Sequence, residues 1–295
     1  MVDNSGRGLA GRGWWRVIEN ERNVGFGPAI NQVVRSSRAP FVATLNDDAV
    51  AHPEWLAALV DAMERHPDAG MCASQVRLFG EGVLDSAGML VACDGSSKQR
   101  GHGRPAGAYG AEEEVLLPSG SAALYRRVML DQIGLFNEDF FLYCEDTDLG
   151  LRARWAGWTC RYVPGAIVEH HYSHSAGRAS PLKAYLVERN RLFTLARNFP
   201  AGSMALAPFA SLARYFWHAW FLLGGRGTAA RYHAEGHGTW RMPWFVLRAH
   251  AALVRAWPRL LRERRAIRRG ARIAPAAFAA LLRAHSLTVR EVAEL

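Results

Sequence analysis

The chain has 295 residues, of which 49% are hydrophobic and 21% charged, a balance that excludes a disordered or low-complexity protein. Its four cysteines form no closely spaced pair, which argues against a zinc ribbon or a disulfide scaffold. The first 200 residues carry 21 Lys and Arg against 23 Asp and Glu, whereas residues 201–295 carry 15 Arg and 4 Glu. A near-neutral body followed by a basic segment suggests an anionic partner, either membrane lipid or nucleic acid.

The first half of the chain predicts alternating strands and helices. Residues 14–19 and the apolar run 41–45 are typical of strands, the second of them of a buried parallel strand. Helical patterns cover residues 27–37 and the segment from Pro53 to His66, and residues 71–79 predict a further strand. This alternation favours an α/β fold with a mostly parallel sheet.

The second half begins with a glycine-rich stretch and ends helical. Residues 80–118 are expected to be mainly loop. Elements are then predicted in the order of a helix near 128–133, a helix from Glu145 to Ala156, a strand over 159–163 that Pro164 stops, and continuous helix after Ser180.

Two acidic clusters and a histidine pair are candidates for chemistry. Asn46, Asp47 and Asp48 follow a buried strand, where a carboxylate can hold Mg²⁺ or Mn²⁺ against a diphosphate, although a turn with a helix cap has the same composition.

Glu145, Asp146 and Asp148 can supply a general base or merely cap a helix start. His170 and His171 can supply a metal ligand or belong to a polar loop.

Six segments in a fixed order together resemble a known protein family, although none of them is specific when taken alone. They are NVGFGPAIN, LNDDA, HPEWL, GSAALYRR, FNEDFFLYCEDTDLGLRARWAGW and VPGAIVEHHYSHS. In this order the chain closely resembles the family 2 glycosyltransferases of the GT-A fold, and among them the bacterial rhamnosyltransferase-like members. The resemblance covers about residues 1–200, weakly so through ERNRLFTLARNFP at 188–200. It implies a GT-A-type, Rossmann-like catalytic domain at 1–200 and a helical extension at 201–295.

The resemblance also implies roles for individual residues. LNDDA matches the family's Asp-x-Asp segment, which makes Asp48 the expected metal ligand and leaves Asn46 in the first acidic position. EDTD matches the acidic catalytic motif, so Asp146 is the expected base and Glu145 the alternative. His170 matches the histidine that closes the metal and diphosphate site.

Further positions are implied in nucleotide-sugar binding. They are Asp3, in a VDNSG segment that matches the end of the family's VVDNAS turn, together with Gly25, Asn31, Asn46, Asp47, Asp85 and Arg104. The implied enzyme transfers a sugar from a dTDP- or UDP-sugar to a hydroxyl of a lipid-linked or cell-envelope glycan. It uses Mg²⁺ or Mn²⁺ and inverts the anomeric centre in a single displacement.

The basic extension predicts attachment to the inner face of the cell membrane. Residues 204–223 are nearly long enough to span a bilayer, but Ser211, Arg214 and His218 form one polar stripe. We therefore expect an amphipathic helix in the interface, with Tyr215, Trp217 and Trp220 near the headgroups, and a polybasic segment at Arg262, Arg264, Arg265, Arg268 and Arg269. A helix packed on the catalytic domain or on a second subunit is the alternative. No nucleic-acid partner is expected, because no nucleic-acid fold accompanies the arginines.

The resemblance further predicts a shortened N-terminus. Family members reach the VVDNAS turn after a strand, a helix and a second strand, whereas here Met1 to Asn4 begin at that turn. We expect the strand at 41–45 to expose an apolar edge and this form to be inactive or poorly folded. A misassigned start codon is one explanation. Two rival hypotheses remain, an inactive relative that only binds and an arginine-rich surface-binding module.

Overall fold

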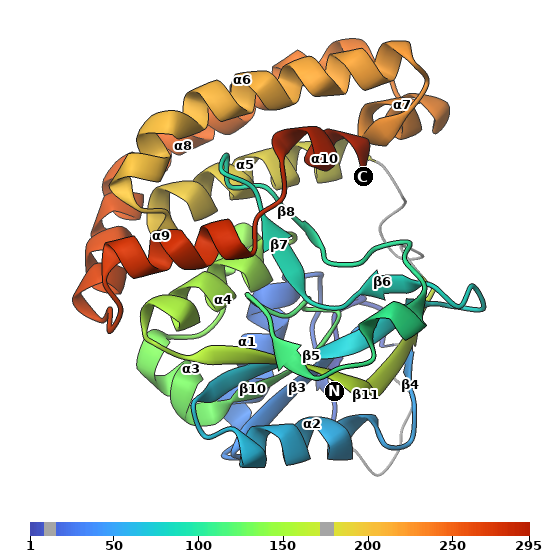
Figure 1. Cartoon of the computed structure of the whole chain (residues 1–295), viewed down its shortest axis with the longest axis vertical. Coiled ribbons are helices and arrows are strands. Elements are labelled where there is room, and N and C mark those ends of the chain that lie inside the picture. Colours follow the sequence, from blue (N-terminus) through green and yellow to red (C-terminus); the bar gives the residue numbers. More distant parts are fainter. Residues whose placement is uncertain (9–15, 172–179) are drawn as a thin grey trace.

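The computed structural model describes residues 1–8, 16–171 and 180–295. A mixed sheet and its flanking helices form one part of the molecule, and the helices of the C-terminal third form a layer over one side of it (Figure 1). Strands and helices combine in an α/β fold, as the sequence predicts.

The strands are β1 (Val2–Asp3), β2 (Ile18–Glu19), β3 (Phe41–Leu45), β4 (Ala49–Ala51), β5 (Ala69–Leu78), β6 (Leu84–Ser86), β7 (Met89–Val91), β8 (Ser97–Gln99), β9 (Glu113–Glu114), β10 (Ala122–Arg126) and β11 (Thr159–His170). The helices are α1 (Phe26–Ser36), α2 (Trp55–Arg65), α3 (Arg127–Ile133), α4 (Glu145–Trp155), α5 (Pro181–Asn198), α6 (Ala201–Leu223), α7 (Gly227–Ala234), α8 (Met242–Arg269), α9 (Pro275–Ala284) and α10 (Val289–Glu294). Short 3₁₀ turns are η1 (Ala106–Tyr109), η2 (Glu138–Phe140) and η3 (Thr239–Arg241).

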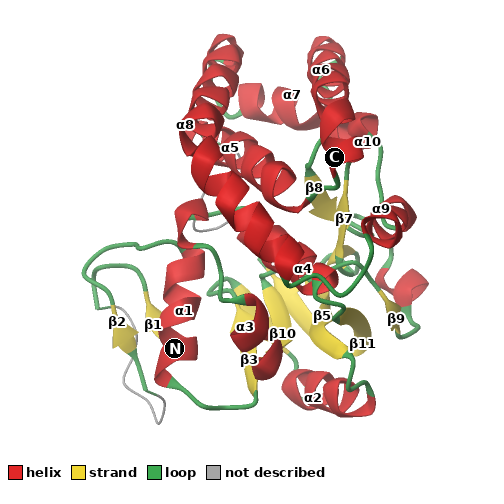
Figure 2. Ribbon diagram, turned by 90° about the vertical axis from the view of Figure 1, so that its left-hand side faces the viewer, coloured by secondary structure: helices red, strands yellow, loops and turns green. Residues whose placement is uncertain are grey.

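The central sheet has the strand order β3-β10-β5-β11-β4, with β6 beside β5 and β9 beside β11. The two longest strands, β5 and β11, are parallel, and the other pairs in this sheet are antiparallel. β1 and β2 form a separate parallel pair beside α1 (Figure 2). Trp14 and Trp15, also expected in that strand, lie outside the described residues.

Two expectations about strands are wrong. Residues 41–45 pair antiparallel with β10 and form an end of the sheet, where Leu45 is 42% exposed. Pro164 does not stop the last strand, which continues to His170. The register between β11 and β5 shifts between Val163 and Ile167, so Pro164 lies in a bulge. Proline has no N–H, but at a bulge the ladder does not need a hydrogen bond from it. The stretch 80–118, expected to be mainly loop, also contains four short strands.

Alternating side chains of the sheet fill two different cores. In β10, Ala123 and Tyr125 face the core shared with α1, α3 and α4, while Ala122 and Leu124 face the core under α2. Successive side chains therefore point to alternate faces, as expected for a strand that lies between two layers of helices. Helices thus cover both faces of the sheet, and the acidic clusters lie at one edge of it.

The C-terminal helices are continuous with the sheet domain through a third core. The Trp155 ring of α4 stacks on Phe278 of α9 with ring centroids 3.9 Å apart, and Phe199 and Leu282 are buried in the same cluster. Helix α5 packs along α8, joined by hydrogen bonds from Arg264 and Arg268 to carbonyls at the end of α5. None of the described helices has the length and hydrophobicity needed to cross a bilayer.

Candidate active site

The two acidic clusters meet at the turn that precedes β10. The Asn46 backbone N–H donates to the Ser121 carbonyl at 2.9 Å, and the Gly120 N–H donates to Asp146 Oδ2 at 2.9 Å. A Cβ atom at position 120 would lie 3.3 Å from both the Asp146 Cβ and the Phe26 ring, so glycine permits this approach. Residues separated by a hundred positions in the sequence thus share one edge of the sheet.

Glu145 and Asp146 are neighbours at the start of α4 with different surroundings. Burial raises the pKa of both carboxyls, that of Glu145 much further because the charge of Asp146 adds to the effect. Asp146 accepts hydrogen bonds from the N–H groups of Gly120 and Thr147, which favour its charged form. Glu145 Oε2 is buried and has no hydrogen-bond partner within the described ranges. Asp146 is therefore the better base of the two.

Asp148, the third acidic residue of this cluster, points away from the site. It forms buried ion pairs with Arg152 at 2.9 Å and Arg197 at 3.0 Å, and it accepts from the Asn198 side chain. Burial opposes its charged form, but the two guanidinium groups hold its pKa below the usual value. Its role is to join α4 to α5.

The loop before α4 is strained. Phe141, Tyr143 and Cys144 all have left-handed backbone conformations, with φ of 63°, 70° and 65°. The Leu142 N–H donates to the Phe140 carbonyl at 2.8 Å, which closes a tight γ-turn centred on Phe141. The loop ends directly at Glu145, so its conformation sets the position of both candidate bases.

The strained loop contacts the start of α1. The Phe141 carbonyl accepts from the Phe26 N–H at 2.8 Å, and a Cβ atom at position 25 would lie 2.5 Å from the same oxygen. Gly25 itself has φ of 95°, a conformation that glycine adopts without strain. The Gly25 position predicted to line the nucleotide pocket therefore abuts the loop that carries the base.

Helix α5 holds the strained loop from the other side. The buried Asn190 side-chain amide donates to the carbonyls of Phe140, Leu142 and Tyr143 at 2.9, 2.7 and 2.8 Å. Arg189 donates to the carbonyls of Asp139 and Phe140. Sequence reasoning did not single out these two residues, although ERNR at 188–191 lies within the weaker part of the resemblance.

Asp48 and His170, the two predicted metal ligands, are in direct contact. His170 Nε2 lies 3.0 Å from Asp48 Oδ1, and His170 Nδ1 lies 2.8 Å from Asp85 Oδ2. The His102 Nδ1 atom lies 3.2 Å from the other oxygen of Asp85. The chain of contacts Asp48–His170–Asp85–His102 joins the turn between β3 and β4 to β11 and β6. Sequence reasoning missed His102, for which the motifs contain no signal.

Attraction between histidine and aspartate side chains governs the protonation of the Asp48–His170–Asp85–His102 contacts. Burial lowers the pKa of His170, but Asp85 and Asp48 more than offset it and the net shift is upward. Burial raises the pKa of Asp85, yet hydrogen bonds from His102 and His170 bring it below its usual value. No cluster of three or more His, Cys, Asp or Glu side chains able to hold a metal occurs in the described part of the chain.

The remaining predicted site residues differ in how deeply they are buried. Asp3 is buried and accepts from the Ser5 backbone and hydroxyl, while the neighbouring Asn4 donates to the Gly25 carbonyl. Asp47 and Arg104 are exposed, and Arg104 lies in the turn beside β6.

Asn31 is buried and bonded to backbone of the segment before α4. Its amide donates to the Phe136 carbonyl and to Glu138, and its oxygen accepts from the Phe136 N–H. Those contacts fit a positioning role for Asn31, and direct binding of nucleotide by it stays a prediction.

Comparison with known proteins agrees with the fold and the motifs. Residues 11–134 match the family model for glycosyl transferase family 2. The chain is 33% identical over 195 residues to the N-acetylglucosaminyl-diphospho-decaprenol L-rhamnosyltransferase of Mycobacterium tuberculosis, covering 58% of this chain and 64% of that protein. It is 39% identical over 67 residues to the rhamnosyltransferase WbbL of Escherichia coli, covering 23% of this chain and 25% of that one.

A solved structure shares the fold at low sequence identity. It is that of GalNAc-T7 with UDP, GalNAc and Mn²⁺, with a TM-score of 0.53, 13% identity, and coverage of 67% of this chain and 39% of that one. At this identity the likeness shows a shared fold. The chain is thus similar to glycosyl transferase family 2 over residues 11–134 and to the mycobacterial rhamnosyltransferase over 195 residues.

Proposed function

We propose that this protein transfers a sugar from a nucleotide-sugar donor to an acceptor hydroxyl with inversion at the anomeric carbon. The observation that supports it most is the meeting of Asp146 with the Asp48–His170 pair at one sheet edge through the Gly120–Ser121 turn. A base and an anion-stabilising pair at the same edge are the two parts that a displacement of a diphosphate requires.

Asp48 and His170 would hold a divalent cation together with the donor diphosphate. One carboxylate and one imidazole suit Mg²⁺ or Mn²⁺ when phosphate oxygens and water supply the other positions. The bound ion would neutralise negative charge on the leaving diphosphate. Asp85 accepts from the second nitrogen of His170 and so orients that ring. This is the arrangement expected around a metal-binding histidine.

Asp146 would remove the proton from the acceptor hydroxyl as that oxygen attacks the anomeric carbon. The N–H groups of Gly120 and Thr147 fix its orientation, and burial raises its pKa above the ordinary value for aspartate. A raised pKa makes the carboxylate a stronger base.

The acceptor we propose is a lipid-linked glycan, and the relative's own acceptor is the support for it. The mycobacterial protein is named for an N-acetylglucosaminyl-diphospho-decaprenol acceptor. The chain spans 64% of that protein, so the acceptor of this one is a proposal. The donor is a dTDP- or UDP-sugar.

A donor screen tests the reaction. The full chain is incubated with dTDP- and UDP-sugars and Mn²⁺, and release of nucleoside diphosphate is measured with and without a polyprenyl-diphosphate-linked N-acetylglucosamine. We expect acceptor-stimulated release with one donor. Binding of nucleotide without release from any donor would instead identify an inactive relative.

We also propose that the extension docks the protein on an anionic membrane surface, at the cytoplasmic side of the cell membrane. Helix α6 carries a stripe of apolar residues that are 56–86% exposed, namely Leu206, Phe209, Leu212, Phe216, Trp220 and Leu223. Beyond it, η3 and α8 expose Trp240, Trp244 and Leu247. Bulky apolar and aromatic side chains at the surface suit insertion among lipid headgroups.

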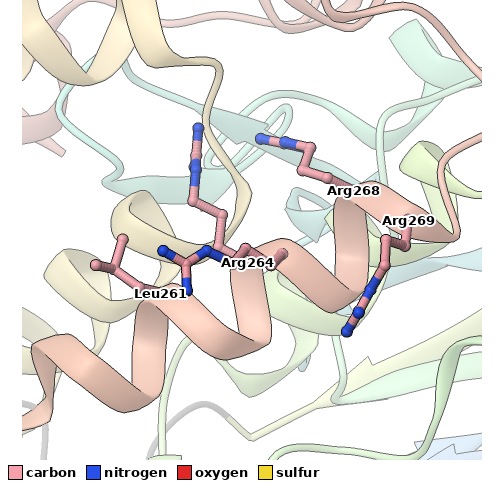
Figure 3. A pocket seen from close by; sticks show the side chains of 5 residues that line it. Leu261, Arg264, Arg268 and Arg269 are labelled. Carbon is pink, nitrogen blue, oxygen red and sulfur yellow. The ribbon is translucent and has the colours of Figure 1, made fainter.

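The arginines of α8 divide into two groups. Arg264 and Arg268 donate to carbonyls at the end of α5, and Arg268 also lies over the Trp155 ring. Arg262, Arg265 and Arg269 are exposed at helical spacing, and Figure 3 shows Arg268 and Arg269 leaving the helix in different directions. Three of the five predicted arginines are thus on the surface, where they suit anionic lipid.

A further inference from the structure

Asn190 is a buried polar residue in the middle of α5, on a face of the helix that is otherwise apolar. It is 0% exposed, and Leu186 and Phe193, one turn to either side, are 3% and 4% exposed. An amide costs free energy at such a position unless hydrogen bonds replace those that it makes with water. The groups that bond to Asn190 therefore indicate what this residue does.

Both ends of the Asn190 side chain are bonded, which fixes its orientation. The amide nitrogen donates to the carbonyls of Phe140, Leu142 and Tyr143 at 2.9, 2.7 and 2.8 Å, and the amide oxygen accepts from Arg189 Nε at 2.8 Å. A carboxylate of the same size could keep the contact with Arg189, but it has no N–H to donate and would repel the three carbonyl oxygens. The donors are therefore the reason for an amide at this position.

The three carbonyls belong to the strained loop before α4. Left-handed backbone at Phe141, Tyr143 and Cys144 costs free energy and persists only where the surrounding structure holds it. The Phe26 N–H of α1 bonds to the Phe141 carbonyl at 2.8 Å, and Asn190 supplies three further bonds from α5. Removal of the Asn190 donors should let the loop relax towards ordinary backbone angles.

The loop leads directly into the helix that carries the proposed base. The carbonyl of Cys144, its last strained residue, accepts the first hydrogen bond of α4 at 2.9 Å. Asp146 lies in that first turn and accepts from the Gly120 N–H at 2.9 Å. The proposed metal-binding pair, Asp48 and His170, lies on other segments of the chain. A shift of the loop should therefore displace the base and leave the donor site in place.

We propose that Asn190 is a positioning residue: its amide holds the loop before α4 in the strained conformation that places Asp146 at the acceptor hydroxyl. This inference rests on the proposed function. It gives Asn190 no contact with substrate, since the side chain is fully buried. A reacting group displaced by about 1 Å can cost about a hundredfold in rate. Asn190 should thus affect the rate of transfer and leave the binding of donor unchanged.

Two variants of Asn190 and one matched control test this in the full chain. Asn190→Asp keeps the size of the side chain and removes its donors, while Asn190→Ala removes the whole amide. Asn198→Ala is the control, because Asn198 is an equally buried asparagine of the same helix. Its amide donates to Asp148 and to the Thr194 carbonyl, which lie outside the strained loop.

Hydrogen exchange measured by mass spectrometry reports on the loop without turnover. We expect both Asn190 variants to exchange residues 137–148 about tenfold faster or more, because the loop opens locally. With an active donor, both should lower kcat about tenfold or more, whereas the dissociation constant of UDP with Mn²⁺ should change by less than about twofold. Asn198→Ala should lower the Tm much as Asn190→Ala does, with loop exchange and kcat retained.

Three outcomes would overturn the proposal. Unchanged exchange of residues 137–148 in the folded Asn190 variants would show that the amide does not hold the loop. Faster exchange with kcat unchanged, or an equal loss of kcat in Asn198→Ala, would leave Asn190 with a structural role alone. UDP binding that weakens as much as kcat falls would assign Asn190 to the donor site. Faster loop exchange in a chain that uses no donor would contradict the proposed reaction, while the hold of Asn190 on the loop stands.

Discussion

At the scale of single residues, the site separates two carboxyl groups that the sequence presents as equivalent. Asp146 receives two backbone N–H bonds and Glu145 leaves one buried oxygen unpartnered among the described residues. Backbone N–H donors stabilise a carboxylate, whereas an unpartnered buried oxygen favours the protonated form. The turn at Gly120, far from both carboxyl groups in the sequence, thus makes Asp146 the better base of the two.

The first prediction concerns catalysis. Asp146→Asn should lower the transfer rate about a hundredfold or more, since it removes the proton acceptor, and should leave donor affinity within a few fold. Steady-state rates and UDP binding measure the two effects. Asp48→Ala is the contrasting variant and should weaken metal-dependent donor binding. Asp146→Asn activity above about a tenth of the original would show that another residue is the base.

The second prediction concerns the pH dependence of stability. Burial raises the pKa of Glu145 in the folded protein, so its contribution to stability is full at low pH and is lost as the pH rises towards the folded-state pKa. Glu145→Gln should therefore increase the free energy of unfolding at pH 8 and change it less at pH 5. Urea denaturation at both values measures this. A larger gain at pH 5 would contradict the assignment of a raised pKa.

At the scale of elements, α6 has the opposite orientation to an ordinary surface helix. Its polar stripe faces the protein, where Ser211 accepts from Arg191 at 3.1 Å and Arg214 pairs with Asp94 and Glu188. Tyr215, which we expected near the headgroups, bonds to Glu188 in the interior instead. The alternative of a helix packed on the catalytic domain is thus correct for its polar side, and its apolar side remains exposed.

The third prediction concerns the exposed apolar side of α6. The full chain should pellet with vesicles containing anionic lipid and be partly released by high salt, because salt screens attraction between arginine and lipid. Leu212→Ser with Phe216→Ser should reduce pelleting strongly. Val128→Ser, on α3, is an equally exposed apolar control and should have no effect. Equal pelleting with neutral and anionic vesicles would refute the contribution of the arginines.

At the scale of the whole molecule, the two predicted parts share their interior. Trp155, Leu151 and Phe199 of the first 200 residues are buried in one cluster with Phe278 and Leu282 of the extension. Arg197 of α5 also pairs with Glu263 of α8 at 3.0 Å. The boundary near residue 200 falls at the turn between α5 and α6, and it stays an interpretation of the sequence.

The fourth prediction follows from this shared interior. A chain ending at residue 200 should be aggregation-prone and lose its cooperative unfolding transition, because removal of α9 exposes the Trp155 and Phe199 side chains. Size-exclusion chromatography and thermal unfolding measure it. A soluble, cooperatively folding residue 1–200 fragment would show that the third core is dispensable.

The long helices and the resemblance to a family can be predicted from the sequence alone. The helix predicted from Glu145 to Ala156 ends one residue early, and the helix predicted over 27–37 lies at 26–36, because capping residues and apolar periodicity act within a few positions. The ordered motifs likewise predicted that Asp48 and His170 lie together, which the 3.0 Å contact shows.

Contacts between residues that are far apart in the sequence could not be predicted without the tertiary structure. The antiparallel pairing of β3, the bulge at Pro164, the inward polar stripe of α6 and the Asn190 bonds to the loop before α4 all join segments that are far apart in the chain. Local patterns record which face of an element is apolar, but the partner that covers that face is chosen by the packing of the whole fold.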